Sequence, residues 1–234
     1  MKIWNGISNF IFGNACLGCL RSGLSLDPWL CPDCREELRR LSHFPRRPNP
    51  DTLCLYAMTP LTKNLVHGLK YGNMPGLAGY MVNLALQDLE TYGTLQAWGK
   101  GLGFVPVPLH PARMRERGYN QAEKLAMAIS RRMKGEVLPV LKRKSFRMSQ
   151  TTLSRENRAS NVAGAFEFKK SWPEHKIPII VDDVYTTGAT TGACLYAFEK
   201  MNLGGFAKVC TLLYEESATA RMDFAADNAM EWHV

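Results

Sequence analysis

The stretch Ile177-Pro178-Ile179-Ile180-Val181-Asp182-Asp183-Val184-Tyr185-Thr186-Thr187-Gly188-Ala189-Thr190-Thr191 decides the fold of this 234-residue chain. It opens with an apolar run, residues 177–181, which is typical of a central parallel strand covered on both faces. Pro178 is tolerated because it lies at the beginning of that strand. A helix is expected to follow from Gly188 to Met201. A buried strand, a polar loop and a helix in this order predict one unit of a parallel α/β sheet.

The polar half of this stretch predicts a binding site. Asp182 and Asp183 come at the carboxyl end of the strand, the edge where open α/β sheets bind ligands. Successive side chains point to opposite faces, so the two carboxylates can reach different parts of one ligand, such as neighbouring ribose hydroxyls. The threonine-glycine loop can present N–H and hydroxyl groups to a phosphate at a helix N-terminus. The alternative is an ordinary strand, turn and helix cap at Thr187. We favour a site for a phosphorylated ribose with Mg²⁺, formed by Asp182, Asp183, Thr186, Thr187, Gly188, Ala189 and Thr190.

Working outward, apolar strand-like runs alternate with helical patterns along most of the chain. Strands are expected at 53–58, 103–107 and 207–214, and helices at 61–70, 77–90 and 121–133. Such alternation predicts a parallel sheet flanked by helices. A proline-rich segment, Pro45 to Pro50, predicts a stiff linker. We therefore expect a module at 1–44, a linker at 45–50 and an α/β domain at 51–234.

Four of the seven cysteines form two Cys-x-x-Cys pairs with eleven residues between the pairs: Cys16, Cys19, Cys31 and Cys34. Each pair can present two thiolates to one ion, and two pairs complete a tetrahedron, so the spacing predicts a structural zinc site. Two disulfides, a redox pair or an iron site are the alternatives. The other cysteines, Cys54, Cys194 and Cys210, lie in apolar surroundings and are expected to be buried thiols.

Positive charge is concentrated in one part of the chain. The formal net charge is +8, yet Arg113 to Arg158 alone holds thirteen Lys/Arg against four Glu. This window can attract a polyanion, or it can be a solvated helix surface. No stretch is long and apolar enough for a membrane span, and residues 1–16 make a poor signal peptide because polar residues break the apolar run. We expect a cytoplasmic protein.

The acid pair and its loop resemble the ribose-phosphate motif of type I phosphoribosyltransferases. The resemblance implies that Asp182 and Asp183 hold the ribose hydroxyls and that residues 186–190 hold the 5′-phosphate of phosphoribosyl diphosphate, bound with Mg²⁺. Three further stretches narrow the resemblance to the ComF family, which includes GntX-type proteins: Val105–His110, Arg115–Glu123 and Gln150 through Arg158 to Phe166. That family is associated with natural competence and DNA utilisation.

Arginines near the predicted site are candidates for a diphosphate clamp, because a guanidinium can bind phosphate through two hydrogen bonds. Arg113, Arg115 and Arg117 are spaced by two and would share a face on an extended loop. Arg155 and Arg158 fall, by the same resemblance, in the flexible loop that closes over the donor. Asn120 is expected to be a helix N-cap.

Three functions follow from these observations. The first is a ComF-like protein of DNA uptake that binds phosphoribosyl diphosphate or a related phosphorylated ribose, together with single-stranded DNA and DNA-uptake proteins. The second is a genuine phosphoribosyltransferase that acts on a base or an amine. The third, an adaptor with a vestigial site, is disfavoured because both acids and the whole loop are present. The sequence identifies no catalytic group and no acceptor pocket, so enzymatic activity stays open.

Overall fold

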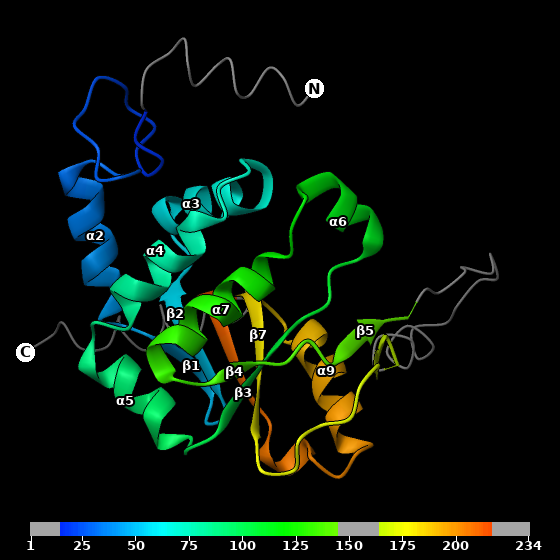
Figure 1. The fold of residues 1–234 in the computed structure, drawn as a ribbon. Helices are drawn as coiled ribbons and strands as arrows, with labels where there is room; N and C mark the ends of the chain where they lie inside the picture. Colours follow the sequence, from blue (N-terminus) through cyan, green and yellow to red (C-terminus); the bar gives the residue numbers. More distant parts are fainter. Residues whose placement is uncertain (1–14, 145–163, 217–234) are drawn as a thin grey trace, which may run out of the picture.

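The computed structural model describes residues 15–144 and 164–216 and is a mixed α/β structure (Figure 1). Its central six-stranded sheet has the order β1-β2-β8-β7-β3-β4, in which all neighbours are parallel except β1 and β2. The strands are β1 (Arg46–Asn49), β2 (Thr52–Ala57), β3 (Leu102–Pro106), β4 (Glu136–Val137), β7 (Ile177–Tyr185) and β8 (Lys208–Tyr214). β5 (Leu141–Arg143) and β6 (Phe166–Phe168) form a separate antiparallel pair. The expected mostly parallel sheet flanked by helices is confirmed.

Helices cover both faces of the central sheet (Figure 1). They are α2 (Pro32–Ser42), α3 (Pro60–Tyr71), α4 (Gly76–Ala85), α5 (Leu89–Ala97), α6 (Pro111–Arg117), α7 (Gln121–Met133) and α9 (Ala189–Glu199), with a short 3₁₀ helix, η1 (Gly204–Phe206). Alternate residues of β7 enter two different hydrophobic clusters. Ile179 and Val181 pack with α3, α4 and α7, whereas Ile180 packs with α9. The apolar run of β7 is therefore explained by burial on both faces.

The connections of β3 and β7 run in opposite directions. From β3 the chain continues through α7 to β4 on one side, and from β7 it continues through α9 to β8 on the other. The gap between the carboxyl ends of β3 and β7 is therefore a topological switch point, the place where open α/β sheets bind ligands.

Local sequence signals set the helix boundaries. The helix expected at 121–133 is confirmed as α7, and Asn120 caps it by accepting a hydrogen bond from the Ala122 N–H at 3.0 Å. The single helix expected at 77–90 is wrong, because the chain forms α4 and α5 there. Asp88 starts α5 by accepting a hydrogen bond from the Thr91 N–H at 2.9 Å. A side-chain cap of this kind favours a new helix over continuation of the old one.

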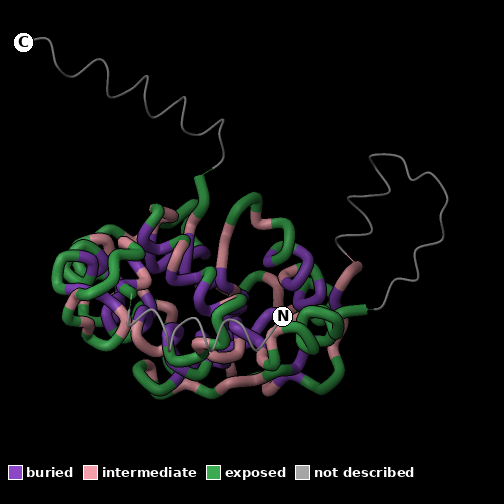
Figure 2. Tube along the Cα trace, turned by 90° about the horizontal axis from the view of Figure 1, so that it is seen from above, coloured by how far each residue is buried: buried purple, intermediate pink, exposed green. Residues whose placement is uncertain are grey.

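The N-terminal part of the described chain packs directly on the α/β core. Cys16, Leu30 and Leu38 belong to the same buried cluster as Leu61 and Leu65 of α3. The Asn64 side chain of α3 donates to the Gly18 carbonyl at 2.9 Å. The segment 45–50, expected as a linker, contains the edge strand β1. Figure 2 shows the buried residues in purple inside a largely exposed green surface.

Among the described helices, none combines the length and the apolar composition needed to cross a membrane.

Candidate functional site

The strand expected at 177–181 continues to Tyr185, so the two predicted carboxylates lie inside the last part of β7, directly after the residue that pairs with the end of β3 at the switch point. Asp183 follows the parity of Val181 and faces α7, whereas Asp182 follows the parity of Ile180 and faces α9. The Asp183 N–H donates to Asp182 Oδ1 at 2.8 Å, which restricts the Asp182 side chain within β7. The acid pair therefore presents two carboxylates in different directions, as the strand period predicts.

Asp183 is buried and held by two side chains from different helices. Lys70 Nζ of α3 lies 2.8 Å from Asp183 Oδ1, and Gln121 Nε2 of α7 donates to Asp183 Oδ2 at 2.7 Å. The Asp183 residue is 6% exposed, so a charge at this position needs such partners. Lys70 was not predicted from the sequence, because its distance from Asp183 along the chain hides the contact. The Gln121 Oε1 atom is buried without a hydrogen-bond partner in the described part of the chain.

Asp182 has a different electrostatic environment. Burial, followed by the neighbouring charge of Asp183, raises the pKa of the Asp182 carboxyl from 3.8 to about 7. Burial and then the charge of Asp182 raise the pKa of the Cys194 thiol in α9, which agrees with Asp182 facing that helix. At neutral pH Asp182 can therefore either accept or release a proton.

The threonine-glycine loop forms a small hollow beside the acid pair. Residues 184–191 line it, and its volume is about 40 Å³. Gly188 has φ of 74°, a left-handed conformation that glycine adopts without strain. Gly188 lies between Thr187 and Ala189, and across this glycine the Thr187 hydroxyl accepts a hydrogen bond from the Ala189 N–H at 3.4 Å, at the beginning of α9. The first N–H groups of a helix have no partners within the helix, so this end of α9 can bind an anion.

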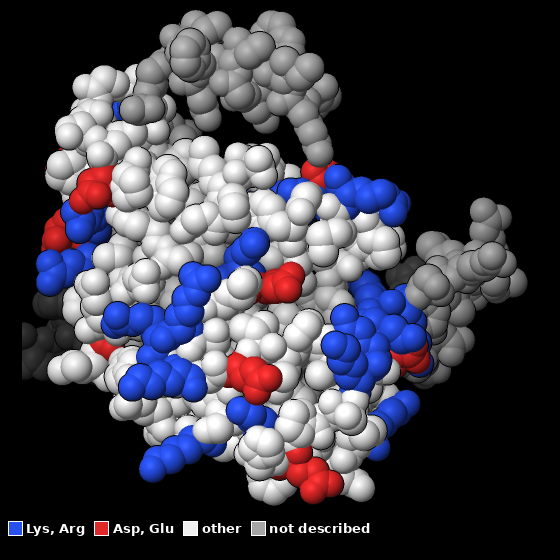
Figure 3. All heavy atoms as spheres, viewed as in Figure 1, with Lys and Arg blue, Asp and Glu red and all other residues white. Residues whose placement is uncertain are grey.

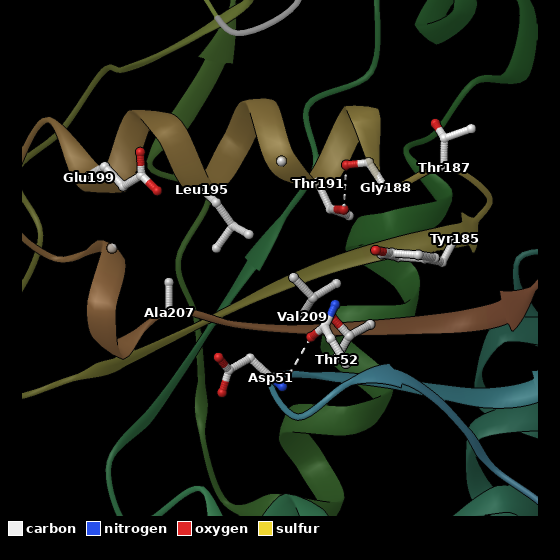
Figure 4. A pocket seen from close by; sticks show the side chains of 13 residues that line it. Asp51, Thr52, Tyr185, Thr187, Gly188, Thr191, Leu195, Glu199, Ala207 and Val209 are labelled. Atoms are coloured by element: carbon white, nitrogen blue, oxygen red, sulfur yellow. Dashed lines mark hydrogen bonds between the residues drawn. The ribbon is translucent and has the colours of Figure 1, made fainter.

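A larger cavity of about 230 Å³ begins at the same loop and runs between α9 and the sheet (Figure 4). Tyr185, Thr187 and Thr191 lie at one end, and Asp51 and Glu199 lie toward the other. Carboxylates repel a phosphate, so the end formed by the loop is the one suited to an anion. Sequence reasoning missed the far end of this cavity, because its residues come from the β1–β2 turn and the end of α9.

The segment after β3 corrects one expectation. Arg113, Arg115 and Arg117 were expected on an extended loop with a shared face, but residues 111–117 form helix α6. His110 caps this helix through a hydrogen bond from Ala112 N–H, and Gly118 ends it with φ of 79°. Residues two apart on a helix point in different directions, so the shared face is wrong.

Among the arginines proposed for a diphosphate clamp, Arg117 lies against another residue of the described structure. Its Nη2 donates to the Tyr71 hydroxyl at 3.4 Å, and its guanidinium carbon lies 5.1 Å from the centre of the Tyr71 ring. Arg115 is exposed on α6. Arg155 and Arg158 lie outside the described residues.

The face of the molecule drawn in Figure 3 shows no single continuous basic surface. In the view of Figure 3, Lys and Arg side chains gather in separate groups, among them groups over α6 and β5. Part of the β5 group is paired, because Lys142 and Lys144 lie 3.1 Å and 3.5 Å from carboxylate oxygens of Glu167. The group over α6 belongs to the segment that joins β3 to α7 at the switch point (Figure 1), and the charge of Arg117 in this segment acts on Asp182.

The four predicted metal-ligating cysteines come together. The sulfurs of Cys16, Cys19, Cys31 and Cys34 all lie within 4.8 Å of one another, and the Cys19 and Cys31 sulfurs are 3.9 Å apart. A tetrahedral zinc site with Zn–S bonds of about 2.3 Å needs sulfurs about 3.8 Å apart. All four cysteines are free thiols, which excludes the two-disulfide alternative in this structure. The donor set therefore fits one zinc ion.

Two of these four sulfurs, those of Cys16 and Cys19, accept hydrogen bonds from nearby N–H groups. Hydrogen bonds from the Arg21 side chain and backbone lower the pKa of the Cys19 thiol to about 6. The Cys31 N–H donates to the Cys16 sulfur at 3.3 Å. Such donors stabilise thiolate, the form that binds a metal.

Comparison with known proteins identifies relatives, although no protein-family model matches the chain. The chain is 30% identical over 190 residues to DNA utilization protein YhgH of Escherichia coli O6:H1, covering 75% of this chain and 79% of the relative. It is 27% identical over 180 residues to Competence protein ComFC of Streptococcus pneumoniae, covering 75% of this chain and 70% of that protein. A 90-residue stretch is 38% identical to Competence protein F of Haemophilus influenzae and spans 39% of that protein's length. On the strength of the YhgH match, which extends over most of both chains, this chain belongs to the ComF family.

Proposed function

We propose that this chain binds a phosphorylated ribose, with Mg²⁺-bound phosphoribosyl diphosphate as the first candidate, on a type I phosphoribosyltransferase-like sheet. One observation carries the proposal: the acid pair and the N-terminus of α9 meet at the switch point between β3 and β7. A ribose phosphate needs both parts, because its hydroxyls donate to carboxylates and its phosphate accepts from N–H groups.

The ligand would span three parts of the chain. Asp182 and Asp183 would accept hydrogen bonds from the ribose hydroxyls, and residues 186–190 would hold the 5′-phosphate. Arg117 and Arg115, together with Arg155 and Arg158, would contact the diphosphate. Mg²⁺ would reduce the charge of the diphosphate, and the four cysteines would hold a structural zinc ion.

The biological role we propose is in DNA uptake or utilisation in the cytoplasm, with single-stranded DNA and DNA-uptake proteins as partners. The names of the relatives, competence proteins and DNA utilization proteins, support this role. DNA binding through the basic groups would weaken steeply with salt, because each phosphate contact releases counterions. Fluorescence anisotropy with a labelled single strand at several salt concentrations tests this part of the proposal.

A second candidate is a genuine phosphoribosyltransferase acting on a base or an amine. The feature that favours it is the position of Asp182 near the carboxyl end of β7, where burial and then the charge of Asp183 raise the pKa of its carboxyl toward the operating pH, at which a general base works best. Release of pyrophosphate on mixing phosphoribosyl diphosphate with an acceptor would support this candidate.

Calorimetric titration tests the shared ribose-phosphate site. Phosphoribosyl diphosphate with Mg²⁺ is titrated into the zinc-loaded wild type and into the Asp182→Asn/Asp183→Asn double variant. We expect micromolar binding to the wild type and at least tenfold weaker binding to the double variant. Asp51→Asn is the matched control, because Asp51 lies at the far end of the neighbouring cavity. Absence of binding to a folded wild type would refute the proposal.

A further inference from the structure

An exposed aromatic residue is connected to the acid pair through its neighbours Lys70 and Arg117, since Lys70 contacts Asp183 and the charge of Arg117 acts on Asp182. Tyr71 is the last residue of α3 and is 47% exposed, and it directly follows Lys70, whose ammonium contacts Asp183. The basic window of the sequence contains few aromatic residues, but the fold brings Tyr71 to it from a separate segment. The helix that supplies Lys70 to the predicted sugar site therefore also carries an exposed aromatic ring at its last residue.

Two neighbouring side chains fix the Tyr71 ring. Arg117 of α6 lies over it, with 5.1 Å from its guanidinium carbon to the ring centre, and also donates to the Tyr71 hydroxyl. The His67 ring lies 4.9 Å away, centre to centre, at an angle of 46°. Tyr71 is therefore ordered before any ligand arrives, which reduces the entropy cost of binding.

Tyr71 is not needed to fill the core of the molecule. The buried face of α3 consists of other residues, including Leu61, Leu65 and Leu69. The C-terminal part of α3 is anchored by a different tyrosine, Tyr119, whose hydroxyl donates to the Leu69 carbonyl. The Tyr71 ring is almost half exposed, and Arg117 and His67 contact it. Such a ring is better suited to contact with a ligand than to packing in the core.

The charge around Tyr71 restricts the ligand class. Helix α6 carries three arginines and one glutamate, which favours an anion. The Arg117 Nε atom is buried and has no hydrogen-bond partner among residues 15–144 and 164–216. Buried donors are rarely left unpaired in native proteins, so this nitrogen is suited to an acceptor supplied by a ligand.

We propose that Tyr71, together with Arg117, forms a nucleobase-binding site next to the acid pair, and that the base is one attached to a phosphate. The inference rests on the proposed function, because the ribose-phosphate site determines which part of a ligand reaches Tyr71. Bases of any identity stack on an aromatic ring, and the arginine interacts with the attached phosphate. A free nucleotide and a single-stranded DNA share this chemistry.

Fluorescence of 2-aminopurine tests the site, because the fluorescence falls when this base stacks. Two probes are used at one salt concentration: 2-aminopurine deoxyriboside 5′-monophosphate and a 12-nucleotide single strand with one central 2-aminopurine. The variants are Tyr71→Phe, which keeps the ring, and Tyr71→Leu, which removes it. Tyr196→Leu is the matched control, since Tyr196 is also exposed on a helix with a cation, Lys200, 4.6 Å from its ring centre.

We expect wild type and Tyr196→Leu to quench at least one probe with affinities within about twofold, and Tyr71→Phe, which keeps the ring but loses the hydroxyl that accepts from Arg117, to bind that probe with an affinity between those of wild type and Tyr71→Leu. Tyr71→Leu should bind that probe about fivefold to a hundredfold more weakly, the range expected for loss of one stacked base. An effect on the nucleotide assigns the site to free nucleotides, and an effect on the strand alone assigns it to DNA. Equal binding of both probes by Tyr71→Leu and wild type, or no quenching of either by wild type, overturns the inference.

The same proteins separate this inference from the proposed function. If phosphoribosyl diphosphate gives no heat with wild type but Tyr71→Leu still weakens base binding, the ribose-phosphate proposal fails and the base site stands. If phosphoribosyl diphosphate binds but Tyr71→Leu and wild type bind the 2-aminopurine probes equally well, the base site fails and the ribose-phosphate proposal stands.

Discussion

Replacing Asp182 with asparagine should stabilise the ligand-free protein at neutral and alkaline pH. The change keeps an oxygen at the position that accepts the Asp183 N–H, and it removes a carboxyl whose pKa is raised to about 7, first by burial and then by Asp183. A raised pKa means that the folded protein binds the proton more tightly than the unfolded chain does. The contribution of the Asp182 carboxyl to the free energy of unfolding is therefore fully present below about pH 4, and it is lost as the pH rises through about 7.

The magnitude follows from the size of the shift. A change from 3.8 to about 7 is about three pKa units, and each unit is worth about 1.4 kcal/mol, so about 4 kcal/mol is the upper bound. Asp182 is partly exposed, and solvent screening reduces this value, so we expect Asp182→Asn to gain about 2–4 kcal/mol at pH 8. Between pH 5 and pH 8 the difference between variant and wild type should widen by about 1–3 kcal/mol.

Urea denaturation of the zinc-loaded proteins at pH 5, 6, 7 and 8 measures this difference. Comparing variant with wild type cancels the titration of histidines and cysteines that both proteins share. Glu174→Gln, which removes a negative charge from an exposed position, controls for net charge and should show a constant difference. If the free energies of unfolding of Asp182→Asn and wild type differ by the same amount at pH 5 and pH 8, the electrostatic reasoning is refuted.

Three further changes test the loop, the metal centre and the core. Gly188→Ala should lower the free energy of unfolding by about 1–2 kcal/mol and weaken ribose-phosphate binding, because φ is 74° and a Cβ would lie 2.6 Å from the Tyr185 hydroxyl. Thermal melts measure the stability and calorimetry measures the affinity, and an unchanged affinity would contradict the role of the loop. Cys16→Ser should abolish binding of one zinc per chain and lower the melting temperature, whereas Cys54→Ser should keep the metal; a colorimetric zinc assay decides, and retained zinc in Cys16→Ser would disprove the site. Phe198→Ala should lower the free energy of unfolding in urea by about 3–5 kcal/mol, because the ring is fully buried between Phe168 and Trp172. A loss below about 1 kcal/mol would show that the hydrophobic cluster between β7 and α9 is loosely packed.

The sequence was most informative where several local signals agreed. The buried strand β7, the acid pair near its carboxyl end and the helix after Gly188 each have their own signature, and the structure contains all three in that order. The boundaries of α7 were also predictable, because Asn120 supplies a cap and Gln121–Met133 keeps one apolar face. The cysteine cluster was predictable because the spacing of the Cys-x-x-Cys pairs is typical of four thiolates brought together to hold one metal ion.

Other parts of the site depend on contacts between distant segments, which no local pattern reveals. Lys70 is an ordinary last-turn lysine in the sequence, and only the packing of α3 on the sheet brings it to Asp183. The short helix α6 was mistaken for a loop because a proline-rich start is common to both. Pro111 at the first helical position and Gly118 just past the end were the available signals.

Helix α3 has a consequence for anyone who wishes to shorten this protein. In the first half of the helix Asn64 donates to the backbone of the Cys16–Cys19 segment at Gly18, and in its last turn Lys70 contacts Asp183. The flank of the helix near Leu61 is covered by the same segment, since a Cβ built on Gly18 would lie 2.5 Å from the Leu61 side chain. A chain trimmed to begin at residue 45 would lose that cover and uncover apolar surface on α3. The cysteine-containing segment is therefore part of the packing of the α/β core, and its removal would be expected to destabilise that core.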